Sequence, residues 1–126
     1  MMLHLVLVAI GGAMGASLRH LVNLASLRLL GPNFPWGTMA VNIAGSFAMG
    51  IFIELLARRF NASNELRLLV ATGILGGFTT FSAFSLDFAT LVERGPTAPA
   101  VGYVLASVVG SLAAIFAGLW LGRALA

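Results

Sequence analysis

Four long apolar stretches make up nearly all of the chain. They run over about residues 3–29, 36–57, 66–92 and 100–121. A helix needs about 20 apolar residues to cross a bilayer, so each stretch is long enough to be a transmembrane helix. The segments between them, at residues 31–35, 58–67 and 95–99, hold turn-forming proline and glycine or a polar run. The pattern predicts an all-α integral membrane protein, with residues 1–126 forming a single transmembrane domain.

The third apolar stretch contains a segment that an ordinary membrane helix would not need. Residues 73–87 read Gly-Ile-Leu-Gly-Gly-Phe-Thr-Thr-Phe-Ser-Ala-Phe-Ser-Leu-Asp. Glycine pairs weaken a helix, and hydroxyl side chains offer the backbone other hydrogen-bond partners. In hydrocarbon, backbone released from a helix is tolerated only where it is buried in protein or lines a cavity. The sequence therefore predicts a break in the third helix, at membrane depth and beside polar groups.

Aromatic and hydroxyl residues alternate across this segment. Its phenylalanines are spaced by 3, 3 and 4 residues, which predicts one aromatic stripe on one helix face: Phe78, Phe81, Phe84 and Phe88. Such a stripe is usually a packing surface. The hydroxyl residues interleaved with it favour a further role. Asp87, near the end of the span, is expected either to be solvated or to pair with an arginine across an assembly.

Two other spans carry polar residues every four positions, which places each set on one helix face. The second span has Thr38, Asn42 and Ser46, and the fourth has Tyr103, Ser107 and Ser111. A lone buried amide often serves as a contact between helices. A row of polar groups is better explained as the lining of a wet path.

Small residues recur at the same spacing and predict close helix packing. Gly11 and Gly15 form a G-x-x-x-G motif in the first span. A longer ridge in the fourth span comprises Gly110, Ala114, Gly118 and Gly122. Arg19 lies late in the first span, so it either anchors at the interface or faces an aqueous vestibule. Glu54 has Arg58 four residues on, which predicts a local ion pair.

Composition agrees with a membrane location. Residues are 60% hydrophobic and 9% charged, whereas soluble domains carry about 25% charged residues. There is no cysteine, hence no disulfide or thiolate site, and all seven basic residues are arginine. These arginines are scattered among apolar spans, so the basic balance does not indicate nucleic-acid binding. Four lie on the side of the termini and two or three on the other, which gives only a weak preference for termini inside and is compatible with insertion in either orientation.

The available chemistry excludes most enzyme classes. No carboxylate pair, Ser-His-Asp set, phosphate loop or Cys/His cluster is present, so an enzyme is not expected. Hydroxyls, an amide and the positive edges of phenyl rings suit an anion, whereas backbone carbonyls exposed at the break suit a small hard cation. Without a carboxylate at midspan, passive conduction is favoured over proton-coupled transport. One four-helix subunit is too thin to enclose a pore, so an oligomer is expected.

Three motifs, in order along the chain, resemble those of the Fluc/CrcB fluoride channels. They are Gly11-Gly12-x-x-Gly15-Ala16-x-x-Arg19, Gly37-Thr38-x-x-Val41-Asn42-x-x-Gly45-Ser46-x-x-x-Gly50 and Gly76-Gly77-Phe78-Thr79-Thr80-Phe81-Ser82-Ala83-Phe84. The resemblance covers essentially the whole chain. It implies a dual-topology homodimer of two antiparallel subunits in the plasma (inner) membrane, with two fluoride pores that export fluoride passively and so lower its cytoplasmic concentration.

The resemblance also implies roles for particular residues. A structural Na⁺ at the dimer centre would be held by the backbone carbonyls of Gly76 and Thr79. Arg19 would lie in the vestibule. The remaining positions would line the anion pore: Phe81, Phe84, Asn42, Thr38, Ser82, Tyr103, Ser107 and Ser111. His20, Phe78 and Ile115 depart from the pattern and leave open the shape of the vestibule and the far end of the hydroxyl row.

Two other functions compete with this one. A proton-coupled drug exporter of the small multidrug type is also small and four-spanned, but its mechanism needs a carboxylate deep in the first span, and none is present there. A non-transporting subunit of a membrane assembly would account for the small-residue ridges. Such a subunit would leave the polar residues of the second, third and fourth spans unexplained.

Overall fold

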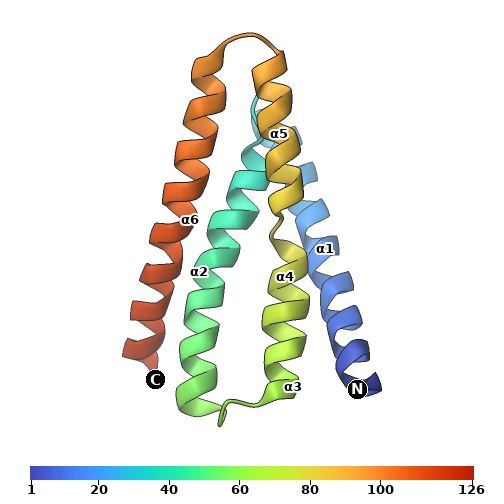
Figure 1. Cartoon of the computed structure of the whole chain (residues 1–126), viewed down its shortest axis with the longest axis vertical. Coiled ribbons are helices and arrows are strands. Elements are labelled where there is room, and N and C mark those ends of the chain that lie inside the picture. Colours follow the sequence, from blue (N-terminus) through green and yellow to red (C-terminus); the bar gives the residue numbers. More distant parts are fainter.

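The computed structural model describes residues 1–126 and contains four helices that are long and apolar enough to cross a membrane. These are α1 (Met2–Leu30), α2 (Trp36–Arg59), a composite third helix over Asn64–Glu93, and α6 (Thr97–Leu125). The predicted all-α fold with four spans is confirmed. Both termini lie at the same end of the bundle as the turn between α2 and α3 (Figure 1).

The third helix is built from four pieces. It begins with α3 (Asn64–Arg67), continues as a π-helix, η1 (Leu68–Leu75), and then as the single turn α4 (Gly76–Phe78). Two extended residues follow, before α5 (Phe81–Glu93). The predicted break is therefore confirmed and lies at Thr79 (φ −87°, ψ 160°) and Thr80 (φ −155°, ψ 123°). The π-helical segment was not predicted.

The G-x-x-x-G motif of α1 packs against the first half of the third helix, as predicted. A Cβ atom added to Gly15 would lie 2.8 Å from the backbone nitrogen of Phe78 and would overlap the carbonyl of Ile74. In the other direction, a Cβ atom on Gly77 would lie 2.7 Å from the carbonyl oxygen of Gly12. Backbone therefore meets backbone here, and only glycine allows this approach.

The small-residue ridge of α6 packs against α2, again as predicted. A Cβ atom on Gly110 would lie 2.8 Å from Ile43 Cδ1, and one on Gly122 would lie 2.7 Å from Glu54 Cβ. Gly50 provides the matching close approach on α2, where an added Cβ would lie 2.7 Å from Leu119 N. The bundle is thus held by two tight helix pairs, α1 with η1–α4 and α2 with α6, and the break directly follows α4 in the first pair.

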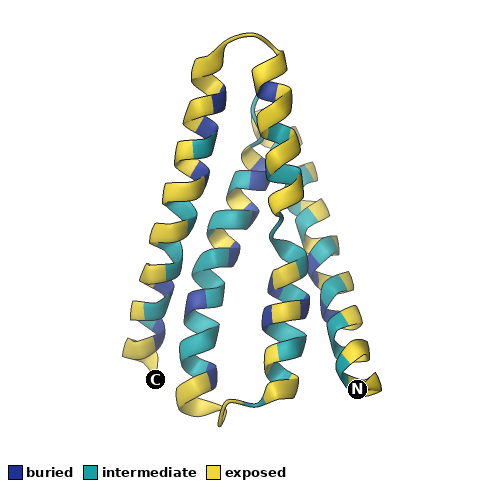
Figure 2. Ribbon diagram, in the orientation of Figure 1, coloured by how far each residue is buried: buried dark blue, intermediate teal, exposed yellow.

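Little of the single chain is enclosed. Only 17 of 126 residues are buried, and most of the outward-facing helix surface is exposed (Figure 2). In a membrane, this apolar surface contacts lipid or another subunit, because a monomeric soluble protein does not expose so large an apolar area.

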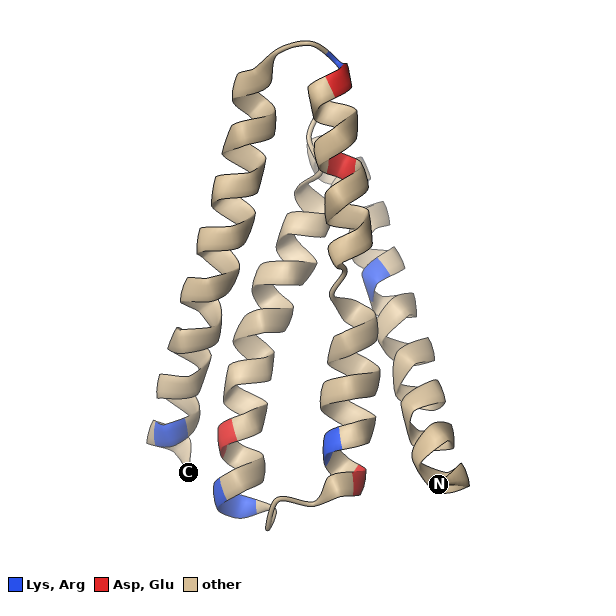
Figure 3. Ribbon diagram, viewed as in Figure 1, with Lys and Arg blue, Asp and Glu red and all other residues tan.

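Most charged residues lie toward the ends of the bundle, whereas one basic position lies part-way along α1 (Figure 3). The predicted i,i+4 pair is confirmed, with Arg58 Nε 3.0 Å from Glu54 Oε2. Arg123 also contacts this carboxylate, 2.9 Å from Oε1, which the sequence did not reveal. Glu54 therefore links the C-terminal turns of α2 and α6 through ion pairs. These pairs lie on the side of the bundle where both chain termini lie.

Candidate functional site

Side chains from α1 and α2 bind the backbone around the break. Asn42 on α2 makes two hydrogen bonds to Thr80: its Nδ2 donates to the Thr80 carbonyl (3.0 Å), and its Oδ1 accepts from the Thr80 amide (2.8 Å). Arg19 on α1 donates from Nε to the carbonyl of Gly77 (3.1 Å). These contacts replace hydrogen bonds that a continuous helix would have made within itself.

The two threonines of the break bond in opposite directions. The Thr79 hydroxyl donates back to the Leu75 carbonyl (3.0 Å), while the Thr80 hydroxyl accepts from the Ala83 amide (3.1 Å). Thr80 is thus the N-cap of α5, a role typical of threonine. This cap was not predicted, although a threonine directly before a resumed apolar run is the usual signal for one.

These bonds leave two carbonyls without their helical donors. The Thr80 amide, which would bond the Gly76 carbonyl in a regular helix, donates to Asn42. The Ala83 amide, which would bond the Thr79 carbonyl, donates to the Thr80 hydroxyl. Oxygens released in this way suit a small hard cation. The backbone at Gly76 and Thr79 therefore fits the chemistry that a Na⁺ site needs.

A cavity of about 320 Å³ lies beside the break. It is open on one side of the single chain and is lined by side chains from α2, the break, α5 and α6: Asn42, Ser46, Thr79, Thr80, Phe81, Phe84, Ser107, Val108, Ser111 and Leu112. The hydroxyls of Ser107 and Ser111 are buried and have no partner within the chain. No charged side chain lines this cavity. It therefore offers neutral hydrogen-bond donors and aromatic rings at membrane depth.

The two phenylalanines of this cavity differ in exposure. Phe81 is 78% exposed on the single chain, whereas Phe84 is half-buried. Their ring centroids lie 5.6 Å apart, and that of Phe84 lies 5.2 Å from that of Tyr103. The predicted four-membered stripe is wrong, because the break places Phe78 on a different helix from the other three. The Phe78 ring instead packs near Gly45.

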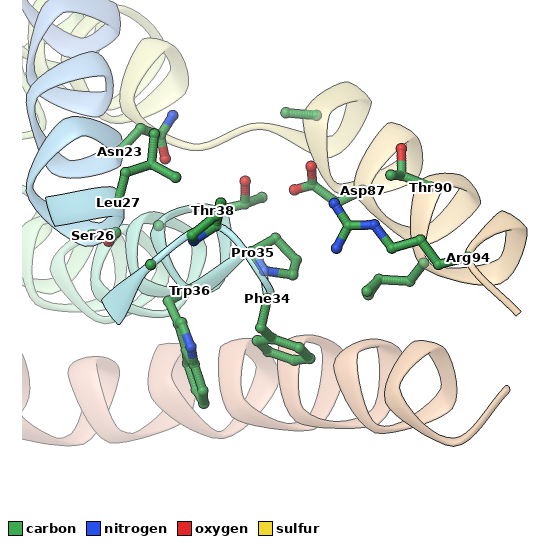
Figure 4. A pocket seen from close by; sticks show the side chains of 15 residues that line it. Asn23, Ser26, Leu27, Phe34, Pro35, Trp36, Thr38, Asp87, Thr90 and Arg94 are labelled. Atoms are coloured by element: carbon green, nitrogen blue, oxygen red, sulfur yellow. The ribbon is translucent and has the colours of Figure 1, made fainter. Parts of the chain in front are cut away.

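Thr38 and Tyr103 lie outside this cavity, toward the loop between α1 and α2. The Tyr103 hydroxyl donates to Asp87 Oδ2 (3.0 Å), a partner that neither expectation for Asp87 included. Thr38, Asp87 and Arg94 line a second cavity, of about 340 Å³. Figure 4 shows these three side chains pointing into the same space. The sequence analysis did not identify Arg94, which also donates to the Asn33 carbonyl (3.1 Å).

Four predicted site residues line neither cavity: Arg19, Gly76, Ser82 and Tyr103. Arg19 is engaged with the Gly77 carbonyl, which neither the interfacial nor the vestibule interpretation had included. Ser82 is exposed on the single chain, with its hydroxyl 3.4 Å from that of Thr80. The structure thus brings together Asn42, Phe81, Phe84, Ser107 and Ser111 around one cavity and separates the other predicted pore residues from it.

A broken membrane helix beside a cavity without charged side chains is typical of one class of protein. This class comprises the multi-pass membrane proteins that let small solutes cross the bilayer. The comparisons with known proteins identify the family. The family described as CrcB-like protein, Camphor Resistance (CrcB) matches residues 6–119, and this chain belongs to it.

Similar curated proteins cover nearly the same length. A protein of Mesorhizobium japonicum is 68% identical over 98% of this chain and 99% of its own, and one of Chelativorans sp. is 64% identical over the same shares. A protein of Agrobacterium fabrum is 61% identical over 97% of this chain and 98% of its own. Each of the three is named "Fluoride-specific ion channel FluC".

Proposed function

We propose that this chain forms a fluoride-selective channel in the plasma membrane that lets fluoride leave the cell passively and so lowers its cytoplasmic concentration. It is a channel and not an enzyme. The observation that carries the proposal is the cavity beside the break, where neutral donors and aromatic rings meet at membrane depth. The family and the names of its members support the choice of fluoride over other small anions.

The lining suits a small, strongly hydrated anion. Fluoride enters the membrane only if protein groups replace its water, and hydroxyl and amide donors do this without a fixed charge that would retain the ion. The unpartnered hydroxyls of Ser107 and Ser111 are available for this purpose. The edges of the Phe81 and Phe84 rings carry partial positive charge and add a weaker attraction. Tyr103, Thr38 and Ser82 would extend the path beyond the cavity.

Fluoride efflux from liposomes containing purified protein tests the proposal and separates it from the alternatives. A channel releases fluoride without a proton gradient and with chloride excluded. A proton-coupled exporter would need the gradient, and an assembly subunit would release nothing. Absence of efflux from well-folded protein, with valinomycin present so that potassium can follow, would refute the channel.

We further propose that the functional unit is a homodimer of two antiparallel copies. The single chain leaves Phe81 exposed beside the cavity, and Gly76, with its released carbonyl, is exposed inside the third span. A backbone oxygen without a donor is costly in hydrocarbon, so a second copy covering this surface is favoured. The weak arginine bias is consistent with insertion of the chain in both orientations.

Reporter fusions at the C-terminus test the dual topology. Because the arginine bias is weak, we expect both a cytoplasmic and an external reporter to be active in one population of cells. Adding two or three lysines to the 58–67 loop should shift nearly all copies to one orientation. A single location of the unmodified C-terminus would contradict antiparallel insertion.

We propose that a structural Na⁺ binds where the two copies meet and is not transported. The carbonyls of Gly76 and Thr79, which have lost their helical donors, would hold it, contributed by both copies. The ion would supply positive charge that compensates the converging carbonyl dipoles. Arg19 adds a further fixed positive charge beside this backbone, through its bond to Gly77.

Replacing Ser107 with alanine is expected to reduce fluoride flux without reducing stability. The buried Ser107 hydroxyl has no partner in the chain, so its removal breaks no internal hydrogen bond and leaves the thermal midpoint unchanged or slightly higher. Loss of one donor to the anion, worth about 1 kcal/mol, should slow flux by about fivefold. Equal flux from Ser107→Ala and the unmodified protein would remove this serine from the path.

A further inference from the structure

We infer that Asn42 is a positioning residue: its carboxamide pairs with the peptide of Thr80, holds the helix break open and thereby directs the Gly76 carbonyl to the cation site. The cation part of this inference rests on the proposed function. The pairing with Thr80 rests on geometry alone, because the two bonds, of 2.8 and 3.0 Å, engage both the amide and the carbonyl of one residue.

The carboxamide acts here as a substitute for a peptide group. It offers one carbonyl oxygen and one NH₂ group, the same acceptor and donor that a neighbouring backbone unit would supply. Two bonds to a single residue fix both the position and the orientation of the Thr80 backbone. One N–H of the amide remains, and Asn42 also lines the cavity. Its contact with a passing anion would therefore come from a group already held in place.

The pairing explains why the break persists in a membrane. Without Asn42, the Thr80 amide would have no partner at a depth where water is scarce. Its nearest alternative is the Gly76 carbonyl, four residues earlier, which is its acceptor in a regular helix. Forming that bond requires Thr79 and Thr80 to leave their extended conformation. Without Asn42 the amide would therefore alternate between this bond and no bond, and the Gly76 oxygen would no longer be held at the cation site. The Thr80 amide can thus bond either Asn42 on α2 or the Gly76 carbonyl, and this choice links α2 to the cation site.

Hydrogen exchange at the Thr80 amide tests the pairing, with the full-length protein in liposomes. The amide should be protected in the unmodified protein and should exchange about tenfold faster in Asn42→Leu. The leucine side chain is similar in size to asparagine and has no polar atom. Ser46→Ala is the matched control, since Ser46 lies one turn away on the same cavity wall and makes no hydrogen bond to Thr80. The Thr80 amide should remain protected in the Ser46→Ala variant. Equal protection of that amide in Asn42→Leu and the unmodified protein would overturn the inference.

The cation part has its own readout, the thermal midpoint in sodium chloride compared with choline chloride. We expect the unmodified protein and Ser46→Ala to gain stability from Na⁺ and Asn42→Leu to gain none. A Na⁺-dependent gain that survives in Asn42→Leu would separate Asn42 from the cation site and overturn that part. If the unmodified protein shows no gain, the proposed cation fails, while exchange at Thr80 still decides the pairing.

Asn42→Asp provides a second variant that decides the matter if Asn42→Leu does not fold. A carboxylate keeps the acceptor for the Thr80 amide but places a negative charge at the cavity. We therefore expect the Thr80 amide to stay protected and the Na⁺ gain to persist, while fluoride efflux falls at least tenfold. Rapid exchange of that amide in Asn42→Asp would refute the pairing. A residue whose only role was to contact the anion would leave Thr80 exchange unchanged in every variant.

Discussion

Replacing Phe81 and Phe84 together with leucine is expected to reduce fluoride efflux by about 10–100-fold while the protein remains folded. Each ring would present its positive edge to the anion, and edge contacts of aromatic rings are worth about 0.5–1.5 kcal/mol. Each 1.4 kcal/mol corresponds to about a tenfold change in an equilibrium constant. Loss of two such contacts therefore corresponds roughly to the expected range of reduction in efflux. Leucine keeps the apolar volume, so the cavity should not collapse. Initial efflux rates, measured with a fluoride electrode, provide the comparison.

Phe88→Leu is the matched control for the double variant. Phe88 lies on the same helix, α5, is partly exposed and lines neither cavity. Its replacement should leave efflux unchanged. If the Phe81 and Phe84 variant conducts as fast as this control, the ring edges do not contribute to conduction, and the hydroxyls and amide alone would have to account for it.

Replacing Gly15 with alanine is expected to destabilise the fold by about 1–3 kcal/mol, the usual cost of overpacking. The new methyl group would overlap the Ile74 carbonyl and lie 2.8 Å from Phe78 N. Both are backbone atoms, which cannot move away by changing a rotamer, so α1 would separate from α4. Because α4 leads into the break, we also expect loss of flux. Thermal unfolding in detergent measures the first effect.

Gly12→Ala is the control, since a Cβ atom at Gly12 would meet nothing within 4 Å. Alanine is a better helix former than glycine by about 1 kcal/mol, so this variant should be as stable as the unmodified protein or more so. Equal destabilisation by the two substitutions would show that a methyl group added anywhere in this part of α1, and not the close contact at Gly15, explains the loss.

The sequence predicted those features that depend on local chemistry. Span lengths follow from apolar runs, the break from a glycine pair followed by two threonines, and the close helix contacts from small residues four apart. Gly15 and Gly118 accordingly lie against backbone atoms of neighbouring helices. Each of these features is determined by a few adjacent residues, so a single chain suffices to predict them.

Features that depend on the rotation of one helix against another could not be predicted in this way. The face containing Asn42 was identified, but its two bonds to Thr80 depend on how α2 and the break meet in space. The same holds for Arg19 and the Gly77 carbonyl. Periodicity also assumed a continuous helix through residues 78–88, and the break removed Phe78 from the expected stripe. The π-helix of Leu68–Leu75 has no recognisable signal in this short apolar run.

Voltage-coupled fluoride efflux tests the central claim most directly. Liposomes loaded with potassium fluoride, or in a parallel sample with potassium chloride, and containing the purified protein are diluted into buffer free of both anions at equal pH on both sides. Conduction of an anion alone builds an opposing voltage, so we predict little efflux until valinomycin lets potassium follow, then rapid release of fluoride and no comparable release of chloride. Fluoride release that needs a proton gradient, or chloride release at a similar rate, would contradict a passive fluoride-selective channel.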